Sequence, residues 1–186
     1  MGSNLSILLQ KDEIELISSE TGFTPKQIKR LYSRFTNLDK NNLGYLTRHD
    51  FARIPELHVN PLRDRIIEVL IDDYGQDEKI NFRQFAKVMS IFNQNDIDSN
   101  DNKEKKLRFL FSFYDRDKDE NINKTELIGI ISMLVGNNLS NELISGIADR
   151  TLNDYGADGF ISYQMFKQAL GKRISIDDKM NIKFLT

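Results

Sequence analysis

One twelve-residue stretch, DRDKDENINKTE from 115 to 126, carries oxygen-bearing side chains at a spacing suited to a hard cation. Side-chain oxygens occur at places 1, 3, 5, 9 and 12 of the stretch, in Asp115, Asp117, Asp119, Asn123 and Glu126. Asn121, at place 7, would add its backbone carbonyl. Calcium takes about six to eight oxygen ligands, and a short loop leading into a helix can supply them at alternate places. The chemistry indicated is calcium binding.

This order of ligands is that of an EF-hand loop, which lies between two helices. Apolar runs typical of helices flank it on both sides, and Ile122 at place 8 suits the short strand that pairs with a sister loop. Glu120 occupies place 6, where glycine is expected; a side chain in that turn costs on the order of 1 kcal/mol. A solvated acidic turn is the alternative, although charge alone does not produce this ordered alternation.

The same unit recurs along the chain, which predicts an all-α fold. Loops begin at Asp39, Asp73, Asp115 and Asp154, and their eighth places hold Leu46, Ile80, Ile122 and Ile161. We expect four EF-hand helix-loop-helix units in two lobes. Short antiparallel β pairing would join the loops two by two, Leu46 with Ile80 and Ile122 with Ile161.

Three of the four loops lack ligands. In the first, Leu43 offers no oxygen at place 5 and Asp50 is shorter than the usual closing glutamate. In the second and fourth, glycine removes the place 3 ligand and the place 12 carboxylate is missing: Gly75 and Gln84, Gly156 and Met165. The closing glutamate supplies two oxygens and a full charge. We therefore expect one calcium ion per chain, in the third loop.

The degenerate units keep the signals that build helices. Thr24, Pro25 and Gln27 form a helix start, with a capping hydroxyl, proline at the first helical place and a reciprocal glutamine. Each loop has a good N-cap residue at place 9: Thr47, Asn81, Asn123 and Ser162. Apolar faces follow on the exiting helices at Phe51 and Ile54; Phe85, Val88 and Met89; Leu127, Ile130 and Leu134; Phe166 and Leu170. These faces would be core, or would line a groove if the hands are open.

Composition narrows the class. The 186 residues are 39% hydrophobic with a net charge of −2, so a packed core is feasible and nucleic acid is not an expected partner. The chain has no cysteine, which removes disulfides and thiolate sites. We divide it into an N-terminal segment and helix (1–22), an N-lobe (23–92), a polar linker (93–106), a C-lobe (107–172) and a tail (173–186).

Both ends carry signals. Gly2 and Ser6 fit the N-myristoylation pattern, with a start left by an expression vector as the alternative. One acyl chain gives only marginal membrane affinity, so a second contact is needed for stable attachment. The tail alternates apolar and polar residues from Ile174 to Leu185. It could pack into a lobe, or cover a hydrophobic groove until a target displaces it.

Together these features resemble the calcineurin B homologous proteins over nearly the whole chain. The resemblance rests on the following strings: MGSNLS, TGFTPKQIKRLYSRFTNLDK, RIPELHVNPLRDRII, KLRFLFSFYDRDKDE, MLVGNN, SGIADRT and KMNIKFL. Glutamate at place 6 of the third loop also looks like that family. Calcineurin B itself is similar through the third hand and LVGNNL, but it normally has four working loops. The homologous family usually keeps ligands in its third and fourth loops, and Gly156 and Met165 depart from that pattern.

The resemblance implies a myristoylated, calcium-binding adaptor that is not an enzyme. It would bind a juxtamembrane amphipathic helix of plasma-membrane sodium/proton exchangers and support their activity and trafficking, with calcineurin inhibition as a further role. The expected locations are the cytoplasm and the cytoplasmic face of the plasma membrane or secretory-pathway membranes, with the nucleus as another. Rival interpretations are a regulatory chain of the calcineurin B type for a phosphatase, a calcium buffer and an enzyme. His49 and His58, the only histidines, have poor spacing for a shared catalytic face.

Overall fold

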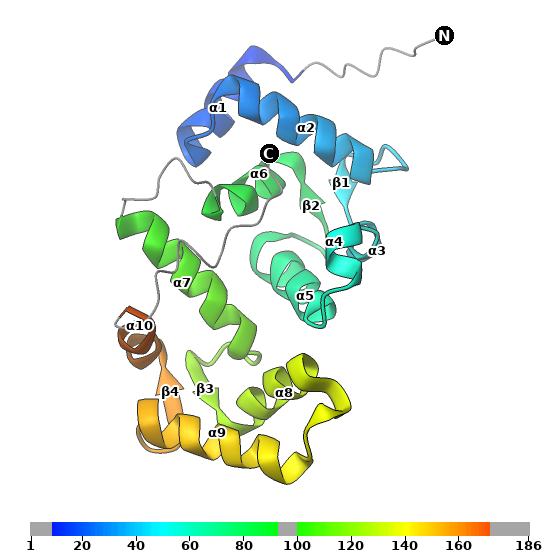
Figure 1. Cartoon of the computed structure of the whole chain (residues 1–186). Helices are drawn as coiled ribbons and strands as arrows, with labels where there is room; N and C mark the ends of the chain where they lie inside the picture. Colours follow the sequence, from blue (N-terminus) through cyan, green and yellow to red (C-terminus); the bar gives the residue numbers. More distant parts are fainter. Residues whose placement is uncertain (1–8, 93–99, 172–186) are drawn as a thin grey trace.

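The computed structural model describes residues 9–92 and 100–171, and these fold into two helical lobes. The N-lobe contains α1 (Lys11–Thr21), α2 (Pro25–Leu38), β1 (Tyr45–Leu46), α3 (Arg48–Ala52), α4 (Pro55–His58), α5 (Arg63–Tyr74), β2 (Ile80–Asn81) and α6 (Phe82–Ile91). The C-lobe contains α7 (Asn100–Tyr114), β3 (Asn121–Asn123), α8 (Lys124–Val135), η2 (Gly136–Asn138), α9 (Asn141–Tyr155), β4 (Phe160–Ser162) and α10 (Tyr163–Gly171). In Figure 1, α7 runs between the two lobes.

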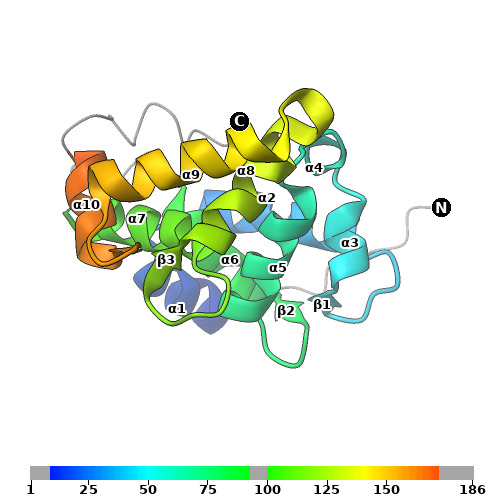
Figure 2. The same cartoon turned by 90° about the horizontal axis from the view of Figure 1, so that it is seen from below.

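The predicted pairing of the loops is confirmed. β1 and β2 are antiparallel with Leu46 opposite Ile80, and β3 and β4 are antiparallel with Ile122 opposite Ile161. All four of these side chains are buried. Each pair therefore joins two hands through an apolar contact at the eighth place of the loop. Figure 2, which is turned by 90°, shows the helices of the last two hands, with α8 and α9 side by side.

The predicted helix starts are confirmed as well. Thr24 and Gln27 form a capping box at the start of α2. Capping boxes at Thr47, Asn81 and Asn123 begin α3, α6 and α8, and the Ser162 hydroxyl accepts a bond from the N–H of Met165 in α10. Each box satisfies backbone donors that would otherwise have no partner.

Two helices differ from the sequence-based expectation. The exiting helix of the first hand ends at Ala52, because Ile54 precedes Pro55 and a residue before proline is driven out of the helical region. The entering helix of the third hand begins at Asn100, so the second half of the predicted linker 93–106 is helical. Its polar composition concealed this helix: Asn102 and Lys106 are buried although they are polar, and Glu104 accepts a hydrogen bond from the Tyr163 hydroxyl of α10 at 2.6 Å.

The two lobes share side chains across α7. One hydrophobic cluster unites α1 to α6, and it also includes Phe109 of α7. Phe111, two residues later, belongs to the second cluster and packs edge-on against Tyr163 and Phe166 of α10. Alternate phenylalanines of α7 thus enter opposite lobes. The helix is a common wall, and its position sets how the lobes meet.

Gly2 and the tail 173–186 lie outside the described residues. Of the helices in the described part, none combines the length and apolar character that crossing a bilayer requires. The side chains of His49 and His58 are both exposed.

Candidate metal centre and partner groove

Three carboxylates converge at the third loop. Oxygens of Asp115, Asp117 and Glu126 all lie within 4.8 Å of one another, and within residues 9–92 and 100–171 no other group of three acidic or histidine side chains does this. Asp115 follows the last residue of α7, while Glu126 lies in the first turn of α8. The group therefore bridges the entering and exiting helices of one hand.

Backbone N–H groups hold these carboxylates in place. The two oxygens of Asp115 accept bonds from the N–H groups of Asp119 and Glu120, both at 3.1 Å. Glu126 Oε1 accepts from the N–H of Arg116 at 2.7 Å, and its Oε2 accepts from the N–H of Asn123 at 2.9 Å. The loop is thus wound around its own acidic side chains, as a cation-binding loop requires.

The other predicted ligands surround this group without joining it. Asp119 Oδ1 accepts from the N–H of Asn121 at 2.7 Å. Asn123 Oδ1 accepts from the N–H of Glu126 at 3.1 Å and so serves as the N-cap of α8. The structure brings together three of the six predicted ligand residues and places the other three on the same loop.

Glu120 takes the left-handed backbone conformation that place 6 demands. Its φ is +65°, compared with +79° for Gly44 at the same place of the first loop. Its exposed carboxylate lies 3.6 Å from the Arg108 guanidinium, which is stacked 3.5 Å from the centre of the Tyr163 ring. This contact connects the turn to α7 and α10. It gives the glutamate a stabilising partner that glycine would lack.

Burial raises the pKa of the Asp115 carboxyl, and the nearby negative charges of Glu126 and Asp119 add to that rise. The two backbone N–H bonds oppose it. A carboxylate that is costly to ionise among other carboxylates is one that a divalent cation would stabilise. The donor set is all oxygen, so the residues present fit calcium.

The second and fourth loops have a different backbone path from that of the third loop, and it leaves no space for a ligand at place 3. α5 and α9 continue through place 2, to Tyr74 and Tyr155, before glycine follows. A tight two-residue turn comes next, with reciprocal backbone bonds between Gln76 and Lys79 and between Ala157 and Phe160. A Cβ on Gly156 would lie 2.6 Å from the Phe160 carbonyl oxygen and 2.7 Å from that of Leu152. No place 3 side chain fits there.

In the first loop, the two acidic side chains are occupied by backbone donors. Asp39 accepts from the N–H groups of Leu43 at 3.0 Å and Gly44 at 2.7 Å. Asp50 accepts from the N–H and the hydroxyl of Thr47 and closes a capping box. Leu43 is half exposed and offers no oxygen. This loop keeps the EF-hand backbone and supplies only two carboxylates.

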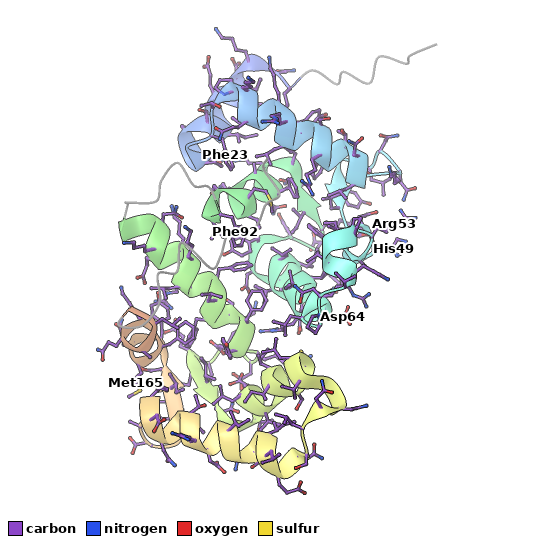
Figure 3. The ribbon with its side chains drawn as sticks, viewed as in Figure 1. Phe23, His49, Arg53, Asp64, Phe92 and Met165 are labelled. Carbon is purple, nitrogen blue, oxygen red and sulfur yellow. The ribbon has the colours of Figure 1, made fainter. Side chains whose placement is uncertain are left out.

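An apolar cavity of about 380 Å³ opens among the N-lobe helices and α7. It is lined by Arg34, Leu38, Phe51, Ile54, Leu57, Asn60, Ile66, Leu70, Phe85, Met89, Phe92, Phe109 and Phe113. We call it the groove. Phe92, labelled in Figure 3 at the end of α6, packs edge-on against Phe109 with ring centres 5.1 Å apart. The sequence predicted the faces of the exiting helices, whereas Phe109 and Phe113 were missed, although their i, i+4 spacing was an available signal.

The fold and the third loop define an EF-hand protein. A scan against models of protein families gave no match. The chain is 39% identical over 185 residues to the calcineurin B chain of Naegleria gruberi, covering 98% of this chain and 99% of that protein. It is 37% identical over 179 residues to the type 2 calcineurin B chain of Dictyostelium discoideum, covering 95% and 94%. With the calcineurin B chain of Candida glabrata it shares 36% over 159 residues, covering 84% and 87%.

The chain therefore belongs to the calcineurin B family of EF-hand proteins. These relatives are named for calcineurin and not for an exchanger, so the narrower assignment to exchanger-binding members stays a proposal. The two short antiparallel strand pairs and the helical lobes agree with the family.

Proposed function

We propose that this chain is a non-catalytic, calcium-binding regulatory subunit of the calcineurin B type, which holds an amphipathic helix of a phosphatase catalytic chain. The observation that carries this proposal is the groove, an apolar cavity of about 380 Å³ lined by residues from α2 through α7. The names of the relatives support the choice of a phosphatase partner. An amphipathic helix docks by placing its apolar stripe in such a groove.

The lining suits that occupant. Phenylalanine, leucine, isoleucine and methionine side chains form most of the surface, with Arg34 and Asn60 as polar members. Phe109 and Phe113 lie one helical turn apart on α7, and Ile66 and Leu70 lie one turn apart on α5. Two apolar ridges facing one cavity would grip the apolar stripe of a helix, while solvent meets its polar side.

The third loop is the proposed calcium site. Its ligands would be Asp115, Asp117, Asp119, Asn123 and Glu126 with the carbonyl of Asn121. A bound ion would supply positive charge among carboxylates that otherwise repel one another. We propose one ion per chain, because Gly75 and Gly156 leave no room for a place 3 ligand in their loops. Calorimetry should then give about one calcium per chain, and Glu126→Gln should abolish that site; a stoichiometry of two or more would contradict the single-site proposal.

The partner is tested by co-expressing the chain with a calcineurin catalytic chain and capturing the complex. Ile66→Glu puts a charge in the groove and should abolish capture. Val59→Glu is the matched control, since Val59 is 82% exposed and is not a lining residue, and it should bind normally. If the unmodified chain captures no catalytic chain, the assignment to a phosphatase is wrong. If Ile66→Glu captures the catalytic chain as well as the control does, the groove is not the binding site.

A second candidate function is an adaptor for sodium/proton exchangers. This candidate is favoured because the hands depart from the four working loops of calcineurin B. Within the described residues there is one cluster of carboxylates suited to a metal, and in two loops backbone carbonyls leave no room for a place 3 side chain. In this second candidate function, myristate on Gly2 brings the chain to the cytoplasmic face of the membrane, where the same groove holds a juxtamembrane helix. Capture assays with an exchanger segment and a calcineurin segment in parallel would separate the two partners. Mass spectrometry of the intact chain from cells would test acylation. Failure to capture either helix would favour a simple calcium buffer.

A further inference from the structure

Arg65 is a buried charge whose partners lie mostly in the other lobe. The residue belongs to α5 of the N-lobe, and its side chain is only 5% exposed. Its guanidinium donates to the backbone carbonyls of Ser112, Phe113 and Asp115, at 3.0 Å for Phe113 and 3.2 Å for Asp115. On its own helix it pairs with Glu68 at 3.1 Å.

The carbonyls of Ser112 and Phe113 lie in the last turn of α7, where a helix end leaves carbonyls without intrahelical partners, and Asp115 follows that end directly. The last carbonyls of α7 have no N–H to accept from, and a cation at a helix C-terminus stabilises them. Arginine presents several donors in a rigid fork, so one side chain can satisfy adjacent carbonyls. The cap is unusual because it comes from another lobe, 47 to 50 residues earlier in the chain.

The capped turn joins both proposed functional regions. Asp115 is place 1 of the third loop, so its carbonyl is held by Arg65 while its carboxylate belongs to the converging acidic group. Phe113, whose carbonyl is also held, lines the groove. On the other side, Ile66 directly follows Arg65 and lines the same groove. One side chain thus fixes two walls of the groove and the entry to the loop.

Ion pairs at the rim repeat this arrangement. Arg116 and Lys118, at the non-ligand places 2 and 4 of the third loop, pair with Glu68 at 3.5 Å and Asp73 at 2.6 Å. Both basic side chains are more than half exposed, and exposed pairs contribute little. These ion pairs show the orientation of the third loop, whose basic side chains at places 2 and 4 face α5. Arg65, buried beneath them, makes the strong contact.

We propose that Arg65 is the positioning residue that couples calcium binding at the third loop to the shape of the groove, by holding the end of α7 against α5. This inference rests on the calcium site and groove proposed above. A change in the loop moves the carbonyl of Asp115, and through Arg65 it moves α5 and its groove residues. The coupling is reciprocal, so a helix in the groove also strengthens calcium binding.

The test compares Arg65→Met with Arg63→Met. Methionine keeps an apolar stem but donates no hydrogen bond. Arg63, two residues earlier on α5, forms an ion pair with its exposed neighbour Asp64, labelled in Figure 3, and reaches no α7 carbonyl in the described structure. Because the chain has no cysteine, spin labels can be attached at Lys29→Cys on α2 and Asn153→Cys on α9, both exposed positions. Inter-lobe distance distributions and calcium affinity by calorimetry are then measured on each variant.

We expect Arg65→Met to broaden the distance distribution and to weaken calcium binding at least about fivefold, while Arg63→Met changes neither. A distance distribution of native width together with weakened calcium binding would mean that Arg65 acts on the loop alone. A broadened distribution together with native calcium affinity would mean that the lobes are not coupled to the loop. Either result overturns the proposal, as does a variant in which both the distribution and the affinity are native. Arg65→Lys keeps the charge without the fork and should be intermediate, and it carries the test if the methionine variant does not fold. If the unmodified chain binds no calcium, the proposed calcium-binding function is refuted. The distance measurement would then still test whether Arg65 holds the two lobes together.

Discussion

Replacing Gly156 by alanine adds a methyl group where the closed fourth loop has no space for it. The new Cβ would lie 2.6 Å from the carbonyl oxygen of Phe160 and 2.7 Å from that of Leu152. Both atoms belong to the backbone, so the overlap is relieved only by moving the end of α9 or the start of β4. The φ of Gly156 is −102°, which any residue can adopt, and the effect is therefore purely steric.

The magnitude follows from what must move. Overpacking a well-filled site costs about 1–3 kcal/mol. The two crowded carbonyls also accept the N–H groups of Gly156 at 2.8 Å and Ala157 at 3.0 Å, and weakening such bonds costs about 0.5–1.5 kcal/mol each. We expect a loss of roughly 2–4 kcal/mol in the free energy of unfolding, or roughly 5–15 °C in Tm for a chain of this size.

Urea denaturation followed by circular dichroism measures this loss. Gly129→Ala is the matched control, since Gly129 lies within α8 and a Cβ there would meet nothing within 4 Å. That variant should gain about 0.5–1 kcal/mol, because alanine is the better helix former. A Gly156→Ala chain as stable as the native one would refute the reasoning. It would show that the fourth loop takes an open form with room at place 3, as at Asp117.

Two further predictions concern helix capping and pH. Asn123→Ala should lower the free energy of unfolding by about 0.5–2 kcal/mol in the presence of a chelator, because α8 loses its N-cap; Asn123→Ser should retain most of it, and equal losses in the two variants would argue against capping. Hydrogen bonds from Arg83 and Lys87 lower the pKa of Glu20, on α1, to about 2 from its usual 4.5. A depressed folded-state pKa contributes stability above about pH 4.5 that is lost as the pH falls toward 2. The Tm advantage of the native chain over Arg83→Gln should shrink across this range, and a gap that is constant with pH would contradict it.

The local rules of the sequence were sufficient for the units of this fold. Thr24, Asn81 and Asn123 begin helices because each hydroxyl or amide meets its own backbone a few residues on. The apolar eighth place of each loop identified the strand pairs, since only one register buries both side chains. The acidic alternation from Asp115 to Glu126 located the converging carboxylates for the same reason: ligands within a single short loop are close in sequence and in space.

Contacts between distant segments followed no such rule. The lost ligands of the second and fourth loops were visible in the sequence, but the turn that closes them is fixed by how Gly75 and Gly156 pack against backbone carbonyls. The polar start of α7 concealed a helix, because its Glu104 is paired with Tyr163 and Lys167 of another hand, which a local pattern does not reveal. The sequence also gave no sign that Arg65 would cap a helix about 50 residues away, since the identity of a hydrogen-bond donor does not indicate which distant acceptor it will meet.

The amino-acid sequence by itself thus determined the four hands, their pairing and the one loop with a full set of oxygen ligands, because each depends on interactions within a unit or on a register that burial enforces. Tertiary structure alone decided which residues of α5 and α7 line the groove and how the two lobes are joined. That outcome depends on the simultaneous packing of helices from different units, in which Phe109 enters one core and Phe111 the other.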